Sequence, residues 1–173
     1  QQVVKLYHSD RLNTITERKV KKILATPIKF AGHESIIWIK DVVYENGIFV
    51  GFTMNYAEGV NLANFLNDRW WRRNETRDWD KFKLENENGL DNRIKLCLNI
   101  AKAVYILHQN KNISIVDIKP SNFIVNKNGL VSIIDIDNIE ISENEKIIFP
   151  AQVITTDYSP PEFHKGLNYK TNV

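Results

Sequence analysis

A short polar stretch at residues 114–125, SIVDIKPSNFIV, combines an acid, a base and an amide in front of an apolar run. Asp117, Lys119 and Asn122 fall within six residues, and the run after them has the β-branched and aromatic composition of a strand. A turn rich in Asn leads into a second apolar run, which ends at Asp135. Because the two runs form a predicted hairpin, Asp117 and Asp135 should emerge on the same side of it.

Two carboxylates, an amide oxygen and an ammonium group at one edge of a hairpin suit a site for Mg²⁺ and phosphate. Hard cations take oxygen ligands, and Mg²⁺ is commonly held by one or two carboxylates together with substrate phosphates. The same residues also allow plainer interpretations. Asp135 and Asp137 can cap a turn after a strand, and Asp117 can belong to an extended segment before Pro120.

The first elements of the chain are a predicted strand at residues 3–7, VVKLY, and a helix after it. Thr14, followed by Glu17 three residues later, matches a capping box and so indicates the helix N-terminus. The apolar positions that follow the helical period are expected to face the core; they are Ile15, Val20, Ile23 and Leu24.

Antiparallel hairpins and separate helices make up the rest of the chain. Residues 33–56 indicate two strands joined by an Asn-Gly turn, which is a strong hairpin signal. A short helix is expected within 57–66 and a long one over 91–109, where Cys97 should be a buried, inert thiol. The positions that follow the period of the long helix are Ile94, Leu98, Ala101, Val104, Tyr105 and His108. Residues 67–90 lack a clean period and indicate an insert or long loop. This order of elements favours an α+β fold over a doubly wound sheet.

Composition limits the partners of the chain. It has 173 residues, 43% of them hydrophobic, and 23 basic residues against 21 acidic ones, for a net charge of +2. This balance gives no reason to expect nucleic acid or an anionic membrane as a partner. A single cysteine excludes an internal disulfide and any cysteine-based metal site. No apolar run reaches the ~18 residues of a membrane span and no N-terminal signal pattern is present, so we expect a cytoplasmic setting.

One basic cluster, RWWRR at residues 69–73, is followed closely by acids. We interpret it as a solvated insert anchored by its tryptophans. The alternative is a polyanion patch, or a nucleic-acid module, whose binding would weaken steeply with salt. Residues 138–173, with three of the prolines, indicate an irregular extended tail.

Several motifs, in order along the chain, resemble those of protein kinases. VDIKPSN at 116–122 resembles the catalytic loop H-R-D-x-K-P-x-N, and IDID at 134–137 stands where the D-F-G motif belongs. TTDYSPPEF at 155–163 resembles the end of an activation segment, VVKLY the strand that bears the V-A-I-K lysine, and VGFTMNYAEGVNL at 50–62 the strand leading to the hinge. The resemblance covers nearly the whole chain and implies a two-lobed, α+β protein kinase-like fold.

The resemblance also implies roles for individual residues in a site for ATP and Mg²⁺. Lys5 would hold the α- and β-phosphates and pair with Glu17. Asp117 would accept or orient the proton of the substrate hydroxyl, and Lys119 would steady the γ-phosphate. The remaining roles are shared among six residues: Asn122 and Asp135 for Mg²⁺, Met54 as gatekeeper, the backbone of Asn55 and Ala57 for adenine, and Asn61 for ribose. Thr155 matches the threonine that packs against the catalytic Asp and Lys.

The chain departs from the family pattern in four places. Ile115 and Val116 stand where the His and Arg of the catalytic loop belong, so a phosphorylated activation loop would lack its usual arginine. Asp137 replaces the flexible glycine of D-F-G, where it could add metal affinity or stiffen the segment. No glycine-rich loop precedes Lys5, and no large helices follow Glu162. We therefore expect a fold truncated at both ends.

In this interpretation residues 1–56 are a partial N-terminal lobe and residues 57–173 a partial C-terminal lobe. The expected function is transfer of phosphate from ATP to a Ser or Thr hydroxyl of a protein partner, without the arginine-dependent activation-loop switch. A small-molecule acceptor stays open. The alternative is a pseudokinase or nucleotide-binding scaffold. The motifs look most like those of divergent bacterial kinases associated with helix-hairpin-helix modules or tellurite-resistance-type phosphorylation systems.

Overall fold

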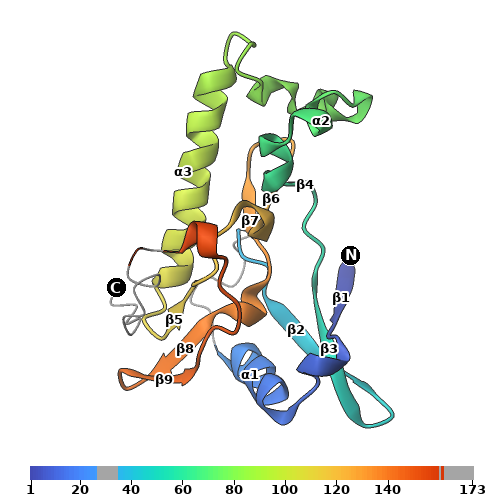
Figure 1. Ribbon diagram of the computed structural model, residues 1–173, viewed down its shortest axis with the longest axis vertical. Helices are drawn as coiled ribbons and strands as arrows, with labels where there is room; N and C mark the ends of the chain where they lie inside the picture. Colours follow the sequence, from blue (N-terminus) through green and yellow to red (C-terminus); the bar gives the residue numbers. More distant parts are fainter. Residues whose placement is uncertain (27–34, 160, 162–173) are drawn as a thin grey trace.

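The computed structural model describes residues 1–26, 35–159 and 161. Its strands form three antiparallel sheets of three strands each (Figure 1). The first sheet has the order β1 (Gln2–Leu6), β3 (Ile48–Asn55), β2 (Ile39–Glu45). The second has the order β4 (Val60–Asn61), β6 (Phe123–Val125), β7 (Val131–Ile133), and the third β5 (Ile113–Ser114), β8 (Glu140–Glu143), β9 (Lys146–Phe149). Separate helices accompany these sheets, so the predicted α+β class is confirmed.

The first sheet carries Lys5 next to the end of β1. The hairpin of β2 and β3 turns at Asn46 and Gly47, which both have positive φ (50° and 79°), and this confirms the predicted Asn-Gly hairpin. Lys5 pairs with Phe52 on β3. The two strands approach so closely that a Cβ atom at Gly51 would lie 2.0 Å from the carbonyl oxygen of Lys5. Glycine at this position therefore allows β1 to dock.

Helix α1 (Thr14–Ala25) begins differently from the expected capping box. Its N-cap is Asn13, whose Oδ1 accepts a hydrogen bond from the Thr16 backbone N–H at 2.9 Å, and Thr14 is the first helical residue. Ile15, expected in the core, is 61% exposed. Val20 and Ile23 are buried as predicted, and Leu24 packs against the core. The remaining buried positions of the inward face are occupied by polar residues, Thr16 and Lys19.

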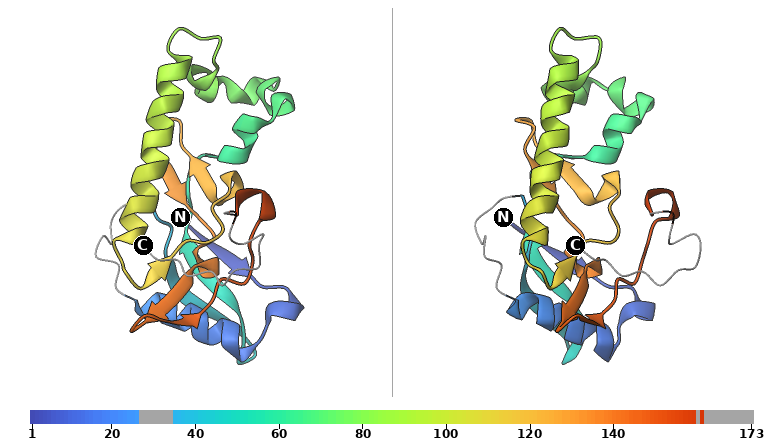
Figure 2. Two further views of the ribbon diagram at one scale, coloured as in Figure 1. Left: turned by 60° about the vertical axis from the view of Figure 1, so that its left-hand side comes forward. Right: turned by 90° about the vertical axis from the view of Figure 1, so that its left-hand side faces the viewer.

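Helix α3 (Gly89–His108) confirms the predicted long helix but not its inward face. Leu96, Ala103 and Leu107 are buried, whereas several predicted apolar positions, Ile94, Leu98 and Tyr105, are exposed. Cys97 is also exposed, so the expectation of a buried thiol is wrong. The helix contacts β7 and β5 and runs alongside the second sheet in both views of Figure 2.

The segment between the first sheet and α3 is largely helical rather than a loop. It contains the 3-10 helices η2 (Leu62–Leu66) and η3 (Asn74–Phe82) and the short helix α2 (Asp68–Trp71). Asn67 caps α2, because its side chain accepts hydrogen bonds from the backbone N–H groups of Arg69 and Trp70. Such short, capped turns give no periodic signal in the sequence.

The segment after the second sheet is also more regular than expected. The 3-10 helix η5 (Ile136–Asn138) leads into the hairpin of β8 and β9, and a further 3-10 turn, η6 (Thr156–Tyr158), follows. The hairpin turns at Asn144 and Glu145, both at positive φ, without a glycine to signal it. Pro160 and Glu162 lie outside the described residues.

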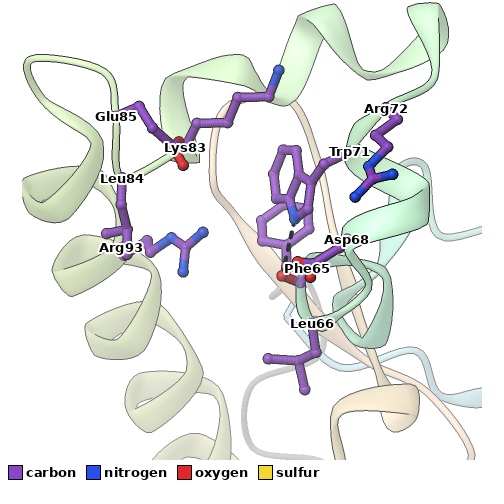
Figure 3. A pocket seen from close by; sticks show the side chains of 9 residues that line it. All are labelled: Phe65, Leu66, Asp68, Trp71, Arg72, Lys83, Leu84, Glu85 and Arg93. Atoms are coloured by element: carbon purple, nitrogen blue, oxygen red, sulfur yellow. Dashed lines mark hydrogen bonds between the residues drawn. The ribbon is translucent and has the colours of Figure 1, made fainter.

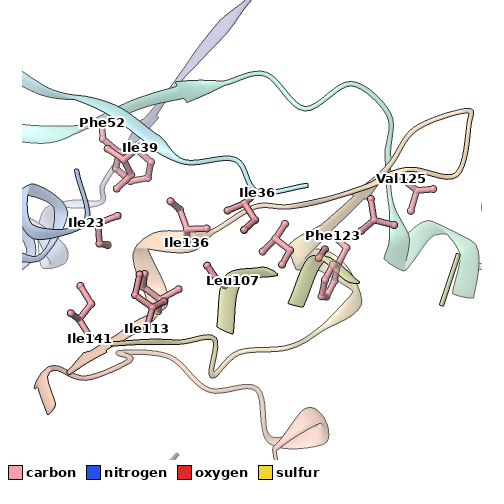
Figure 4. Packing of buried hydrophobic residues seen from close by; sticks show 14 of the residues in the cluster. Ile23, Ile36, Ile39, Phe52, Leu107, Ile113, Phe123, Val125, Ile136 and Ile141 are labelled. Atoms are coloured by element: carbon pink, nitrogen blue, oxygen red, sulfur yellow. The ribbon is translucent and has the colours of Figure 1, made fainter. Parts of the chain in front are cut away.

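A single buried cluster joins these parts. Ile136 lies in the middle of the cluster, between side chains from the first sheet and α1 and others from α3 and β6 (Figure 4). Backbone hydrogen bonds strengthen the connection, since Ile37 N–H donates to Ile133 O at 2.9 Å and Ile133 N–H donates to Ser35 O at 2.8 Å. The buried Ile136 fixes the turn that carries Asp135 and Asp137. Within the described residues, no helix is long and apolar enough to cross a membrane.

Candidate active site

Asp117 lies on the loop between β5 and the 3-10 helix η4 (Pro120–Asn122), and its side chain is only 3% exposed. One carboxylate oxygen accepts a hydrogen bond from the Thr155 backbone N–H at 3.0 Å, and the other lies 2.7 Å from Lys119 Nζ. Asn122 Nδ2 donates to the Asp117 carbonyl oxygen at 2.8 Å. Burial alone would raise the pKa of Asp117, but Lys119, Thr155 and Asn122 stabilise the charged form and the pKa is lowered. Asp117 is therefore ionised at neutral pH.

Lys119 and Thr155 complete this loop. Lys119 Nζ donates to Thr155 Oγ1 at 3.1 Å while it pairs with Asp117. The expected packing of Thr155 against the acid and the lysine is thus confirmed. The contact also fixes residue 155 against the loop, although the two segments are 36 residues apart in sequence.

Asn122 and Asp135 are joined by the backbone. Ile134 N–H donates to Asn122 O at 2.9 Å, so the end of β7 is attached to the loop. Asp135 follows in a left-handed conformation (φ 64°), which aspartate tolerates better than most residues, and its side chain is 33% exposed. Both side-chain hydrogen bonds that the described chain gives Asn122 use its amide nitrogen, so its amide oxygen is left for a cation.

Lys5 lies against the turn that carries Asp135. Its ammonium group pairs with Asp135, and with Asp137 Oδ1 at 2.6 Å. Asp137, whose side chain is 5% exposed, also accepts a hydrogen bond from the Tyr7 hydroxyl at 2.8 Å. Burial lowers the pKa of Lys5, but the charges of Asp137 and Asp135 outweigh burial and the net pKa is raised. Burial and the same acids raise the pKa of Tyr7.

The expected pair between Lys5 and Glu17 is not formed. The Glu17 carboxylate lies 2.8 Å from Lys21 Nζ and accepts a hydrogen bond from the Tyr44 hydroxyl at 2.7 Å. These contacts lower the pKa of Glu17. The physical reason is the helix phase, because α1 turns Thr16 and Lys19 inward and leaves Glu17 beside Lys21 on the next turn.

Lys19 is a buried residue that the sequence did not single out. Lys19 is 3% exposed, and its Nζ donates a hydrogen bond to the Pro150 carbonyl oxygen at 3.0 Å. Burial lowers the pKa of Lys19 to about 8, against the opposing charges of Asp137 and Glu140. No pattern in the sequence distinguishes it from the neighbouring basic residues of α1.

Asn138 is a second residue of the site that the sequence did not single out. Its Oδ1 accepts backbone hydrogen bonds from Gln152 at 2.9 Å and Val153 at 3.0 Å, and its Nδ2 donates to Val153 O at 2.6 Å. It directly follows IDID, and no pattern in the sequence distinguishes it from the polar residues around it. Together with Lys19 and Asp117, Asn138 attaches residues 150–155 to the rest of the site.

The residues expected around adenine lie at the end of β3 and just after it. Met54 pairs with Val3 and is half-buried, and Asn55 ends the strand in an exposed position. Ala57 is half-buried in the segment after it. Asn61 Oδ1 accepts from the Ala63 backbone N–H at 2.9 Å, and its Nδ2 donates to Ser121 O at 2.6 Å. Asn61 thus attaches η2 to the segment that follows Asp117.

A divalent cation would have few protein ligands here. Residues 1–26, 35–159 and 161 contain no group of three His, Cys, Asp or Glu side chains arranged to hold a metal ion. The amide oxygen of Asn122 and the half-exposed carboxylate of Asp135 remain. This donor set fits Mg²⁺ bound together with substrate phosphates, which supply the other oxygens.

The RWWRR segment is anchored as predicted. Its two tryptophans, Trp70 and Trp71, pack with Phe65, while Arg69, Arg72 and Arg73 are exposed. An open pocket of about 670 Å³ lies between this segment and α3. Figure 3 shows the guanidinium groups of Arg72 and Arg93 on either side of the Trp71 ring. Acids also line this pocket, so its charge is mixed.

The family model of the protein kinase domain matches residues 3–173. The chain therefore belongs to the protein kinase domain family. Comparison with curated proteins gives no match.

Proposed function

We propose that this chain carries out ATP- and Mg²⁺-dependent phosphotransfer to a Ser or Thr hydroxyl of a protein partner. In this proposal residues 1–56 form the N-terminal lobe of a two-lobed kinase and residues 57–173 the C-terminal lobe. Membership of the protein kinase domain family supports phosphotransfer in general. The acceptor, the nucleotide and the metal are inferred from the site residues.

The observation that carries the proposal is the environment of Asp117. Its carboxylate is buried and ionised, and Lys119, Thr155 and Asn122 fix its orientation. An ionised carboxylate held in this way can accept or orient the proton of an attacking hydroxyl. Lys119 beside it can neutralise charge on the transferred phosphoryl group.

The other assignments follow the groups that are brought together near Asp117. Lys5 would bind nucleotide phosphates, and Asn122 with Asp135 would hold Mg²⁺, which supplies charge neutralisation when bound. Met54 and the backbone of Asn55 and Ala57 would border the adenine. Asn61 would contact ribose with the second hydrogen of its amide nitrogen, while its present hydrogen bonds support the loop that carries Asp117.

We further propose that activity does not depend on a phosphorylated activation loop. Val116 replaces the arginine that would bind such a phosphate. Residues 150–155 are instead attached by three side chains, since Lys19 binds Pro150, Asn138 binds Gln152 and Val153, and Asp117 binds Thr155. These contacts form without the charge of a phosphate group on the segment.

A nucleotide-binding scaffold is the second candidate. The replacement of the family's glycine by Asp137, which contacts Lys5, supports it because a second acid alters the phosphate-binding end of the site. Retention of Asp117, Lys119 and Asn122 in one hydrogen-bonded group supports transfer, since a scaffold has no need of this group.

The test compares the wild-type protein with Asp117→Asn. Both are incubated with γ-labelled Mg-ATP and a library of Ser- and Thr-containing peptides, and ATP binding is measured by calorimetry in the same preparations. We expect the variant to bind ATP normally and to lose transfer by about 100-fold or more. Asp91→Asn, which removes an exposed acid paired with Lys95, is the matched control and should keep wild-type transfer.

Wild-type protein that binds Mg-ATP without labelling itself or any peptide would favour the scaffold. Equal transfer by wild type and Asp117→Asn would remove Asp117 from the catalytic role. Labelling of a small molecule in place of peptide would correct the acceptor.

A further inference from the structure

Asp135 and Asp137 both contact Lys5, but the structure treats them differently. Asp135 is one-third exposed and lies on the left-handed turn. Asp137 is almost fully buried, and each of its oxygens has a partner: Oδ1 binds Lys5 at 2.6 Å and Oδ2 accepts from the Tyr7 hydroxyl at 2.8 Å. Asp137 is thus held in a fixed orientation, whereas Asp135 is open to another ligand.

A second cation faces the same acid from α1. Lys19 is buried in this helix, which packs on η5, and its charge interacts favourably with Asp137 and Glu140. Removing one member of a buried charged group leaves the others uncompensated, which costs several kcal/mol in typical cases. Asp137 therefore binds Lys5 directly, and its charge also favours the protonated form of Lys19, which lies on the helix that packs on η5.

Glu17 cannot take this place with α1 in its present orientation. Its carboxylate is bound to Lys21 and Tyr44. Successive residues of a helix are rotated by about 100°, so turning Glu17 inward would turn Thr16 and Lys19 away from their buried positions. It would also break the bond from Lys19 to Pro150.

We propose that Asp137 is the positioning residue for Lys5, in place of an acid on α1, and that it keeps Lys5 directed at the nucleotide phosphates. This inference rests on the proposed function, because it assigns Lys5 to those phosphates. Asp135 can leave Lys5 to bind a metal ion, while Asp137 retains it. Helix α1 then contributes a cation, Lys19, and its rotation is not needed to complete the site.

The first experiment measures binding of Mg-ATP and of adenosine to the wild-type protein, Asp137→Asn and Glu17→Gln. Adenosine lacks phosphates, so a loss that acts through Lys5 affects ATP alone, while general damage to the fold affects both ligands. We expect Asp137→Asn to weaken Mg-ATP by about tenfold, a typical effect of losing one charged hydrogen bond, and to leave adenosine unchanged. Glu17→Gln should change neither, and Asp91→Asn is the control for loss of an exposed acid.

Two further variants keep the test decisive. Tyr7→Phe removes only the hydroxyl that holds Asp137 and should weaken Mg-ATP less than Asp137→Asn, again without affecting adenosine. In a Lys5→Met background, Asp137→Asn should have no additional effect on Mg-ATP. Weaker ATP binding in Glu17→Gln with normal binding in Asp137→Asn would overturn the inference, as would equal losses of ATP and adenosine.

A second measurement does not depend on nucleotide binding. Denaturant midpoints are compared in two double-mutant cycles, one pairing Lys5→Met with Asp137→Asn and the other pairing Lys5→Met with Glu17→Gln. Non-additive shifts in the first cycle and additive shifts in the second are expected. If wild-type protein fails to bind Mg-ATP, the proposed function fails, and the cycles still decide which acid holds Lys5. Additive shifts for Lys5 and Asp137 would contradict the inference in either case.

Discussion

Two clusters at the candidate site each join a lysine to aspartate, but they are assembled over very different distances along the chain. The loop cluster, Asp117, Lys119, Asn122 and Thr155, is formed mostly within one short loop, and its first three members fall within six residues. The lysine cluster, Lys5, Tyr7, Lys19, Asp135 and Asp137, joins residues up to 132 positions apart. In the loop cluster, Thr155 makes the contacts with Asp117 and Lys119 that the family resemblance implied. In the lysine cluster, Lys5 contacts Asp135 and Asp137, and Glu17 contacts Lys21.

The difference between the clusters indicates at which of the two sites another element can more easily supply the acid. The acid of the loop cluster is fixed mainly by its own loop, which also carries Lys119 and Asn122. The acid that binds Lys5 needs only to reach its ammonium group. Several elements lie close to this group, so more than one of them could supply the acid. Asp137 reaches it from η5, while α1 supplies the opposite charge through Lys19.

Among changes in the lysine cluster and its surroundings, the largest effect is expected from Ile136, whose side chain lies in the buried hydrophobic cluster. Ile136 is 1% exposed and lies between Asp135 and Asp137. Ile136→Ala should reduce the free energy of unfolding by about 2–5 kcal/mol, because it removes buried methyl groups and leaves a cavity. Chemical denaturation measures this change, with Ile148→Ala on exposed β9 as the control. If Ile136→Ala reduced the free energy of unfolding by no more than Ile148→Ala, the buried hydrophobic cluster would not support the turn that carries Asp135 and Asp137.

An intermediate effect is expected from Lys19, which belongs to the lysine cluster alone. With its pKa lowered to about 8, folded Lys19 releases its proton at a pH where the unfolded chain still holds it. The free energy of unfolding should therefore rise between pH 7 and pH 9 in wild type relative to Lys19→Met, by about 1 kcal/mol for each pH unit above 8. Urea denaturation at the two pH values measures this difference.

Asp137, Glu140 and Arg11 contribute charge around Lys19, and all three are present in both proteins. The raised pKa values of Lys5 and Tyr7 affect stability only above their ordinary ranges, which begin near pH 10. Parallel stability curves for wild type and Lys19→Met would show that Lys19 is not buried in solution.

The smallest effect is expected from Glu17, which lies outside both clusters. Its partners, Lys21 and Tyr44, are at the surface, where ion pairs contribute little. Glu17→Gln should leave both the melting temperature and the transfer rate at wild-type values. A marked loss of transfer would place Glu17 in the site and remove the distinction between the two clusters.

Local signals explain what the sequence could predict. The hairpin of β2 and β3 follows from Asn46-Gly47, whose residue types suit positive φ. The grouping of Asp117, Lys119 and Asn122 follows from their spacing within one loop. Long-range contacts gave no such signal: the partner of Lys19 is the carbonyl of Pro150, 131 residues away, and any residue could supply that carbonyl.

The phase of α1 is the clearest failure of sequence reasoning, and its cause is specific. Thr14 and Glu17 satisfied the pattern of a capping box, but Asn13 is an equally good N-cap and begins the helix one residue earlier. The buried face of α1 is formed by Thr16, Lys19, Val20 and Ile23, which leaves Glu17 beside Lys21. The family motif assigned Glu17 to Lys5 by its position in the sequence. That role requires a residue on the buried face of α1, and Glu17 does not lie on this face.

The measurement that tests this account most directly is a crystal structure of the protein with Mg²⁺ and a non-hydrolysable ATP analogue. The account predicts that Lys5 Nζ contacts Asp137 and the nucleotide phosphates, that Asp135 faces the metal, and that Glu17 stays with Lys21. A structure in which α1 has rotated and Lys5 pairs with Glu17 instead of Asp137 would contradict it.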